Sequence, residues 1–263
     1  MKIGVCLSVF DDKIKRLPEL GADYIEANLT QLSEHSFSEI SERQKLLSSL
    51  GAECYSANCL FPGDIRLTGE GVDYGRISEY IEDVFAKAAI LGLKIAVFGS
   101  GKARSVPDGF SRDAAHDQLK RLLGDIIAPA AEKHGIVCCI EPLRHQETNV
   151  FNTCTDAAKL IREVDSDRIR LLVDLYHMDS ENEPRETLLG CGDILSHAHI
   201  ASAKNSRNIP QPGDGEDYGE FFSILKKIGY QGGISLEGGA GEDFCAGVSS
   251  SIAYLRTIIN DLA

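Results

Sequence analysis

Residues 135–143 have the sequence GIVCCIEPL, and residues 169–177 have the sequence IRLLVDLYH. Each is an apolar run of strand length that contains an acidic residue near its end, Glu141 in the first and Asp174 in the second. Each is also followed by a stretch with helical periodicity, and this alternation is typical of βαβ units with a parallel sheet. The two segments therefore predict an α/β protein.

The same pattern extends in both directions from these segments. Strands are predicted at residues 2–9, 22–29, 52–58, 94–100, 135–143, 169–177, 194–202 and 232–239. Eight such units in 263 residues match the usual size of a closed barrel. We therefore predict a single (β/α)8 TIM barrel that forms one domain over residues 1–263. An open doubly wound sheet is the structural alternative, but residues 6–12 lack the glycine-rich phosphate turn that would follow its first strand.

Helices are predicted between the strands, with capping residues at several ends. They lie at residues 36–50, 74–91, 114–134, 186–189, 218–228 and 244–262, and one more begins at residue 152. Pro129 predicts a kink or break near Ala128, because proline has no amide hydrogen and clashes with the preceding turn. The long loops 62–73 and 203–217 follow strands, where active-site walls and lids are built in such barrels.

The composition excludes several classes of partner. Acidic residues number 40 and basic residues 27, which gives a net charge of −13, so nucleic acid and anionic membranes are poor partners. No apolar run approaches the roughly 20 residues that cross a bilayer, and Met1 leads directly into the first predicted strand. Eight cysteines occur without a C-x-x-C pair, which indicates reduced thiols. We therefore expect a cytoplasmic protein.

Four predicted strand ends in succession carry side chains that bind metals: Glu141, Asp174, His199 and Glu237. They are 33, 25 and 38 residues apart, but the carboxyl ends of barrel strands all open onto one face, so they are expected to converge. Three carboxylates and one imidazole favour a hard divalent ion. Mn²⁺ is the cofactor that we expect, with Mg²⁺, Co²⁺ or Zn²⁺ as alternatives.

Ordered motifs in these segments resemble a known family. They are Ile140-Glu141-Pro142-Leu143 with Glu147 and Asn152-Thr153, then Asp174-Leu175-Tyr176-His177-Met178, then His197-Ala198-His199, and finally Leu236-Glu237. This series resembles the xylose isomerase-like superfamily of sugar isomerases and epimerases, nearest to its D-tagatose and D-psicose 3-epimerase branch. The resemblance covers most of the chain and is strongest over residues 135–239.

The resemblance implies roles for individual residues. Those matching Glu141, Asp174, His199 and Glu237 bind the metal, and Glu141 and Glu237 also form the acid/base pair. His177 and Glu147 match residues that contact the substrate, and Arg207 is the candidate for an arginine that does the same. The implied enzyme is a metal-dependent isomerase that epimerises or isomerises a ketose or sugar phosphate through an enediolate, as a monomer or as a homo-oligomer such as a dimer or tetramer.

Several alternatives stay open. A hydroxypyruvate-type isomerase, or a dehydratase acting on inosose or dehydroshikimate, would use much the same ligands. An endonuclease IV-type phosphodiesterase would need more histidines and a basic groove, and a non-catalytic binding protein would not need both glutamates. The chain has no tryptophan, which often walls the sugar in ketose epimerases. The segment Gly99-Ser100-Gly101-Lys102-Ala103-Arg104 is read as a tight turn or, alternatively, as a site for a substrate carboxylate or phosphate.

Overall fold

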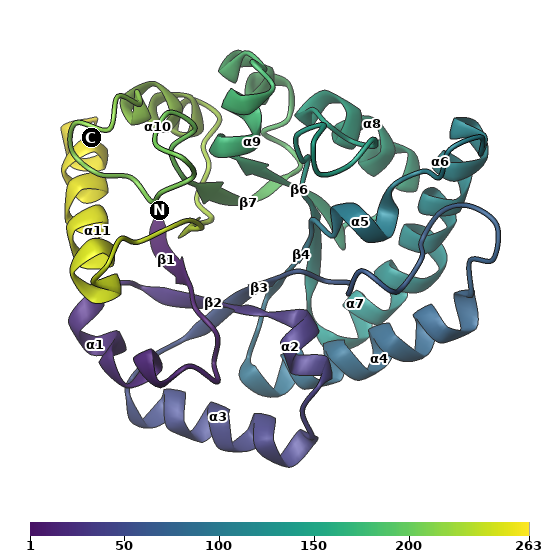
Figure 1. The fold of residues 1–263 in the computed structure, drawn as a ribbon, viewed down its shortest axis with the longest axis horizontal. Helices are drawn as coiled ribbons and strands as arrows, with labels where there is room; N and C mark the ends of the chain where they lie inside the picture. The colour runs from purple at the N-terminus through teal and green to yellow at the C-terminus, as the bar shows by residue number, and fades with distance from the viewer. Residues whose placement is uncertain (263) are drawn as a thin grey trace.

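The computed structural model describes residues 1–262. Eight parallel strands form a closed barrel in which each pairs with the next and β8 pairs with β1, and the helices lie around them (Figure 1). The strands are β1 (Lys2–Cys6), β2 (Tyr24–Asn28), β3 (Cys54–Asn58), β4 (Ile95–Phe98), β5 (Val137–Ile140), β6 (Ile169–Asp174), β7 (Leu195–Ile200) and β8 (Gly233–Leu236). Every strand lies within its predicted range, so the (β/α)8 barrel is confirmed.

Helices fill the connections between the strands. The α-helices are α1 (Leu17–Leu20), α2 (Leu29–Ser33), α3 (Phe37–Ser49), α4 (Tyr74–Leu91), α5 (Gly101–Arg104), α6 (Arg112–Arg121), α7 (Ala128–His134), α8 (Cys154–Val164), α9 (Leu175–Ser180), α10 (Tyr218–Lys227) and α11 (Phe244–Asp261). Two short 3₁₀ helices are η1 (Asp12–Arg16) and η3 (Arg185–Gly190). The predicted helices are all present, whereas the short helices α1, α2, α5 and α9 were not predicted.

Capping residues determine where the outer helices begin. Ser36 and Glu39 form a reciprocal capping box at the start of α3, which satisfies backbone amides that have no partner within the helix. Helix α4 begins after Asp73, whose side chain accepts from the amide of Arg76, and ends at Gly92 with φ of 85°. The predicted ranges 36–50 and 74–91 therefore agree with the observed helices.

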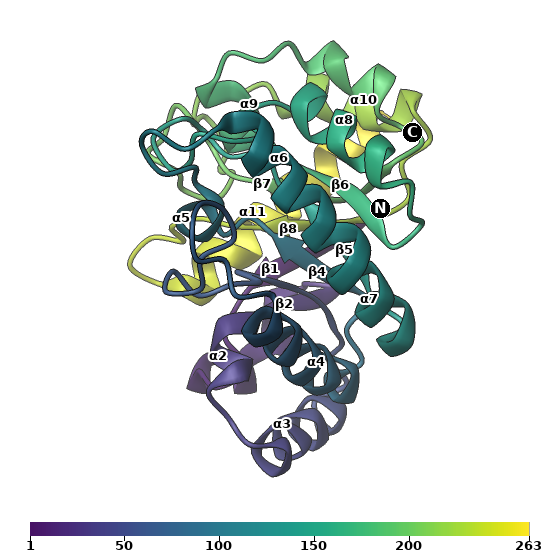
Figure 2. The same ribbon diagram turned by 90° about the vertical axis from the view of Figure 1, so that its right-hand side faces the viewer.

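The predicted disruption of helix 114–134 takes the form of a change in helix type. Residues 122–127 form a π-helix (η2) between α6 and α7, and Pro129 stands in the first turn of α7. Figure 2 shows these three segments as one long rod along the side of the barrel. The chain therefore continues through Pro129 with a change of hydrogen-bond pattern rather than a break.

The sixth strand is shorter than predicted. Strand β6 ends at Asp174, and the next residues form α9 rather than the strand expected as far as His177. Asp174 is the N-cap of this helix, since its Oδ1 accepts from the amide of Tyr176 at 2.9 Å. The prediction of a strand end at His177 was therefore wrong, and this residue lies on a helix.

The interior of the barrel combines an apolar core with a few buried polar groups. Large apolar side chains from strands and helices make up one extensive cluster. Side chains that carry polar groups and are fully buried on the strands include Glu26, Ser56, His197, His199 and Ser235. All eight cysteines are unpaired, and Cys59 is exposed. Within residues 1–262, none of the helices is both long and apolar enough to cross a membrane.

Candidate metal centre and active site

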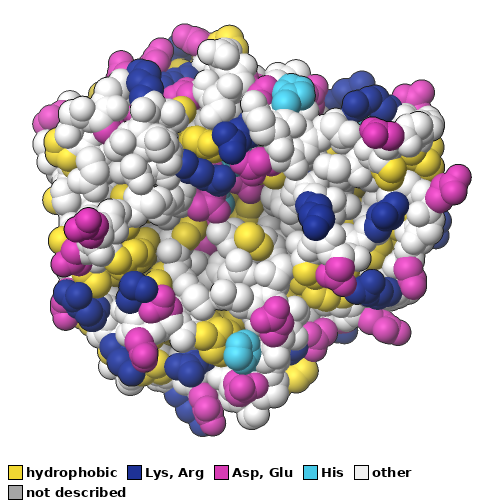
Figure 3. Space-filling model, viewed as in Figure 1, with side chains coloured by type: hydrophobic (Ala, Val, Ile, Leu, Met, Phe, Trp, Pro, Cys, Tyr) yellow, Lys and Arg dark blue, Asp and Glu magenta, His cyan; other side chains and the backbone are white. Residues whose placement is uncertain are grey.

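The four residues expected to converge lie together at one end of the barrel. Glu141 follows β5, Asp174 ends β6, His199 lies in β7 and Glu237 follows β8. The register of β6 and β7 pairs Asp174 with His199 directly. One ligand-capable atom from each of the four lies within 4.8 Å of the others. Figure 3 shows a hollow near the centre of the face seen in Figure 1, with acidic and basic side chains gathered beside it.

Three of the atoms that face one another in this cluster lack hydrogen-bond partners. Nδ1 of His199 lies 3.3 Å from Oε1 of Glu141 and 3.4 Å from Oε2 of Glu237. Nδ1 of His199, Oε1 of Glu141 and Oδ2 of Asp174 are buried and unpaired. Leaving such groups unsatisfied is costly, and a cation among them would satisfy them all. The donor set therefore fits a divalent ion with oxygen and imidazole ligands.

The charges of the cluster perturb its titration. Burial, followed by the charges of Glu237 and Glu141, raises the pKa of Asp174 to about 8. Burial also raises the pKa of Glu141. Burial raises the pKa of Glu237, but the charge and hydrogen bond of His199, and then the charge of Arg207, lower it to about 2. Burial lowers the pKa of His199, yet Glu26 and Glu237 hold it well above its ordinary value. Crowded negative charge of this kind is what a bound cation relieves.

The three predicted substrate-contacting residues adjoin the cluster. Nη2 of Arg207 lies 2.8 Å from Oε2 of Glu237 and 3.8 Å from Oδ2 of Asp174, and its Nη1 lies 3.5 Å from Oε1 of Glu147. Nε2 of His177 lies 3.5 Å from Oδ2 of Asp174 and has no hydrogen-bond partner. Burial, and then the charge of Arg207, lower the pKa of His177 to about 3, so this imidazole is neutral.

The loop after β7 holds Arg207 in position. Ser206 and Arg207 both have positive φ values, 53° and 59°. The carbonyl of Arg207 accepts from the amide of Gly239 at 3.0 Å, and the amide of Ile209 donates to the carbonyl of Gly239 at 2.9 Å. A side chain at Gly238 would overlap the carbonyl oxygen of Arg207. This close backbone contact fixes the arginine beside Glu237.

Several residues of the site were not predicted. Asn58, at the end of β3, donates from Nδ2 to Oε1 of Glu237 at 2.8 Å. The ring of Tyr176 lies close to two guanidinium groups, with Arg207 4.7 Å and Arg144 5.1 Å from its centroid. An aromatic side chain therefore lies beside the cluster although the chain has no tryptophan.

Glu26 is the most deeply placed of the unpredicted residues. Its carboxylate is fully buried on β2 and accepts from Nε2 of His199 and Nε2 of His197, each at 2.7 Å. The hydroxyls of Ser56 and Ser235 donate to it at 2.7 Å and 2.6 Å. One signal for it existed in the sequence, because Tyr24-Ile25-Glu26-Ala27 contains a charged residue inside an otherwise apolar run.

The segment at residues 99–104 turns tightly after β4, as one of the two interpretations expected. Arg104 is fully buried and donates to the carbonyl of Phe98 at 2.9 Å and to that of Glu141 at 2.7 Å. Its guanidinium supports the ends of β4 and β5, so Arg104 itself is not free to bind a substrate anion.

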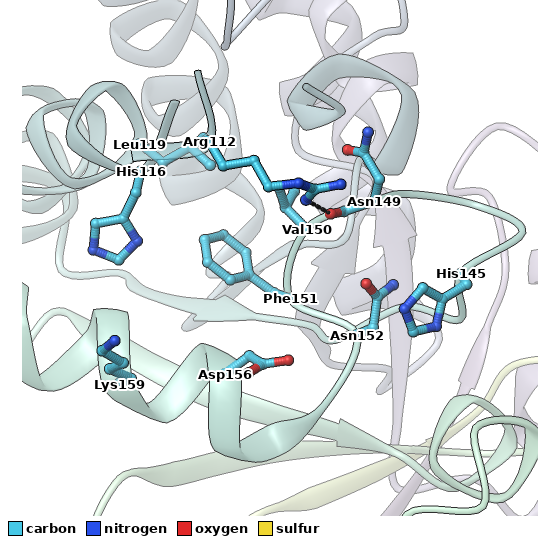
Figure 4. A pocket seen from close by; sticks show the side chains of 10 residues that line it. All are labelled: Arg112, His116, Leu119, His145, Asn149, Val150, Phe151, Asn152, Asp156 and Lys159. Atoms are coloured by element: carbon cyan, nitrogen blue, oxygen red, sulfur yellow. Dashed lines mark hydrogen bonds between the residues drawn. The ribbon is translucent and has the colours of Figure 1, made fainter. Parts of the chain in front are cut away.

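A separate cavity of about 460 Å³ lies between α6, α8 and the loop after β5 (Figure 4). None of the predicted site residues lines it. Its Arg112 donates to the carbonyl of Asn149 at 2.8 Å, and its His116 and His145 are paired with Glu163 and Glu181. Because these polar groups are already satisfied, the metal-competent cluster is the better candidate for the active site.

Comparisons with known proteins find epimerases among the similar proteins. A 3-dehydro-D-guloside 4-epimerase from Escherichia coli K12 is 31% identical over 188 residues, which are 69% of this chain and 68% of the relative. A D-psicose 3-epimerase from Agrobacterium fabrum is 24% identical over 238 residues, 87% of this chain and 78% of the relative. The crystal structure of a 3-keto-D-glucoside 4-epimerase from E. coli matches with a TM-score of 0.83 and 26% identity, over 98% of this chain and 99% of that chain.

These relatives are epimerases, so the expected enzyme class, an isomerase, is confirmed at that level. The family described as xylose isomerase-like TIM barrel matches residues 14–258. Because that match spans nearly all of the sequence, the chain belongs to the xylose isomerase-like TIM barrel family.

Proposed function

We propose that this protein is a divalent-metal-dependent sugar epimerase that acts on a ketose, a related keto sugar or a sugar phosphate. One observation carries the proposal: Glu141, Asp174, His199 and Glu237 bring ligand atoms within 4.8 Å of one another, and one side-chain atom of each of Glu141, Asp174 and His199 is buried without a hydrogen-bond partner. These four residues would hold the ion, and Mn²⁺ is the ion proposed because oxygen ligands predominate. Residues 1–263 are proposed to act as one domain, and a dimer or tetramer stays a prediction.

The names of the relatives support a common chemistry. A D-psicose 3-epimerase acts at the carbon next to the C2 carbonyl of a ketose, and a 3-keto-D-glucoside 4-epimerase acts at the carbon next to a C3 carbonyl. In both cases the inverted carbon is adjacent to a carbonyl, so its proton is acidic. We extend this shared feature to the present chain: its substrate carries a carbonyl beside the carbon that is inverted.

Inversion at such a carbon needs a base on one face and an acid on the other. Strands β5 and β8 are separated by β6 and β7 in the barrel, so Glu141 and Glu237 reach the cluster from different sides. One glutamate takes the proton, and the C–H electron pair moves into the carbonyl to give an enediolate. The other glutamate then returns a proton to the opposite face. When bound, the divalent ion supplies positive charge that stabilises the enediolate oxygens.

The neighbouring polar residues orient the sugar in this proposal. Arg207 provides donors beside Glu237, and the neutral His177 has an unpaired Nε2 facing the cluster. Glu147 lies on the other side of Arg207 and accepts from Arg144 at 2.8 Å. Together they offer both donors and acceptors to substrate hydroxyl and carbonyl groups.

The test is a product screen in D₂O. Ketoses, keto sugars and sugar phosphates are incubated with the protein and Mn²⁺, and the products are followed by NMR. The expected result is an epimer that carries deuterium at one carbon next to the carbonyl. An epimer without deuterium would contradict the proton-transfer route, and a product that has lost water would indicate a dehydratase instead.

A further inference from the structure

Glu26 makes contacts that the proposed reaction does not yet explain. It lies in the middle of β2 with an exposed fraction of 0%, and its two oxygens accept four hydrogen bonds from side chains on three other strands. A buried carboxylate with this many donors is held in one orientation.

The contact through Oε1 determines which nitrogen of His199 faces the cluster. A carboxylate only accepts, so Nε2 of His199, 2.7 Å away, donates its hydrogen to Glu26. In a neutral imidazole the other nitrogen, Nδ1, then carries the lone pair. This atom faces Glu141 and Glu237 and has no hydrogen-bond partner. Histidines that bind metals commonly donate their second N–H to a carboxylate in this way.

The contacts through Oε2 hold the carboxylate itself. His197 Nε2 and the hydroxyls of Ser56 and Ser235 all lie within 2.7 Å of this oxygen. These groups come from β7, β3 and β8, so Glu26 is fixed by strands on both sides of the barrel. It therefore cannot turn away from His199 without breaking several buried hydrogen bonds.

A direct metal-binding role for Glu26 fits less well. Cys6, Glu26 and His199 do lie close enough to share an ion. However, both Glu26 oxygens already accept hydrogen bonds, and His199 Nε2 already points at Glu26. An ion there would have to displace them.

We propose that Glu26 is a positioning residue that fixes the ring orientation and tautomer of His199, so that Nδ1 is available to a divalent cation. This inference rests on the proposed metal site. It makes a specific prediction for Glu26→Gln. The amide oxygen of the new side chain will take the Oε2 position, where three donors converge, and its NH₂ group will face Nε2 of His199. Nε2 must then accept, and the ring proton moves to Nδ1, the nitrogen that faces the cluster.

The first experiment measures binding of Mn²⁺ alone, from the EPR signal of free Mn²⁺ during titration. We expect Glu26→Gln to bind Mn²⁺ about 10- to 100-fold more weakly than the wild type. Glu183→Gln is the matched control, since Glu183 caps α8 at 3.0 Å from the amide of Cys154 and should leave the affinity unchanged. Circular dichroism of each metal-free protein verifies that it is folded.

A second experiment needs no variant. In wild-type protein labelled with ¹⁵N-histidine and loaded with Mg²⁺, we expect NMR to find a proton coupled to Nε2 of His199 and none on Nδ1. A proton on Nδ1 would overturn the inference. Because this measurement uses the wild type, it is decisive even if Glu26→Gln does not fold. If the wild type binds Mn²⁺ and folded Glu26→Gln binds it equally well, only this inference is wrong. If the wild type binds no divalent ion, the metal site and the inference both fail.

Discussion

The carboxylate of Glu141 occupies the space that a side chain at Gly99 would fill. A Cβ atom built at position 99 overlaps Oε2 of Glu141, and its next neighbour from another residue is a methyl carbon of Leu143 at 3.9 Å. Gly99 follows β4 and Glu141 follows β5, so the absence of a side chain on one strand end makes room for the acid on the next. Glycine at this position therefore serves the cluster rather than the turn.

This contact predicts that Gly99→Ala impairs turnover more than stability. The added methyl must displace the Glu141 carboxylate, and overpacking of this kind costs about 1–3 kcal/mol. A displacement of about 1 Å at a catalytic group lowers turnover by up to about 100-fold. Epimerisation rates and thermal melting should be compared with Gly190→Ala, where an added Cβ meets no atom within 4 Å. Equal activity of the two variants would show that Glu141 tolerates the displacement.

The cluster could be predicted because each of its residues lies in the last part of an apolar strand or directly after one. Once eight strands are counted, parallel pairing brings their carboxyl ends to one face, and Glu141, Asp174, His199 and Glu237 must then meet. The end of β6 was not predicted correctly. Leu175 and Tyr176 prolong the apolar run of β6, and periodicity alone does not distinguish a short buried helix from a strand. The N-cap bond of Asp174 is what begins the helix.

Other parts of the site depend on tertiary contacts that a sequence does not display. Glu26 is paired with residues more than 170 positions away, such as His197 and Ser235. Arg207 reaches Glu237 only because consecutive residues with positive φ turn its loop toward β8. Neither Ser206 nor Arg207 is a residue type that signals such a conformation. Arg104 resembled an anion ligand in sequence because nothing there indicates that it is buried.

Replacing Arg207 is expected to weaken substrate binding. Arg207→Met removes the donors that lie beside Glu237 and Glu147, and a hydrogen bond from a charged group contributes about 1.5–3 kcal/mol. We therefore expect KM to rise by about tenfold or more at saturating Mn²⁺. Arg185→Met is a suitable comparison, since Arg185 pairs with Asp179 and Glu220 and should affect stability instead. An unchanged KM in Arg207→Met would remove this residue from the substrate site.

Isotope exchange should distinguish the roles of the two proposed proton-transfer residues, Glu141 and Glu237. At saturating Mn²⁺, Glu141→Gln and Glu237→Gln should each lower epimerisation by about 100- to 10,000-fold. The glutamate that remains in each variant should still exchange the proton of the one epimer whose face it contacts. NMR in D₂O measures both quantities, with Glu53→Gln as a control because Glu53 pairs with Lys2 at 2.9 Å. Undiminished epimerisation in either variant would refute the acid/base pair.

The capping box of α3 predicts a pH dependence of stability. The backbone amide of Ser36, then its hydroxyl and His35, lower the pKa of Glu39 from 4.5 to about 2. A carboxylate with a lowered folded-state pKa stabilises the fold above its ordinary pKa and loses that contribution as the pH falls toward 2. Glu39→Gln should thus melt at a lower temperature than the wild type at pH 7, with a smaller difference at pH 3. Glu42→Gln, an exposed change on the same helix, should show no such trend.

Removal of divalent ions is expected to affect both activity and stability. Without a cation, burial and then the charges of Glu237 and Glu141 raise the pKa of Asp174 to about 8. After treatment with EDTA, turnover should be lost. A ligand present at 100 times its Kd stabilises a folded protein by about 2.7 kcal/mol, so restoring Mn²⁺ to that level should raise the melting temperature by roughly 5 to 10 °C.

The variant Asp174→Asn tests whether that stabilisation arises at the cluster. It replaces a buried carboxyl, whose raised pKa opposes folding at neutral pH, by an amide that does not ionise. The metal-free variant should therefore melt at a higher temperature than metal-free wild type, while the increase caused by Mn²⁺ should shrink. Calorimetry with and without Mn²⁺ measures both changes. If Mn²⁺ stabilised the variant as much as the wild type, the ion would be bound elsewhere, and Asp174 would be only the helix cap of α9.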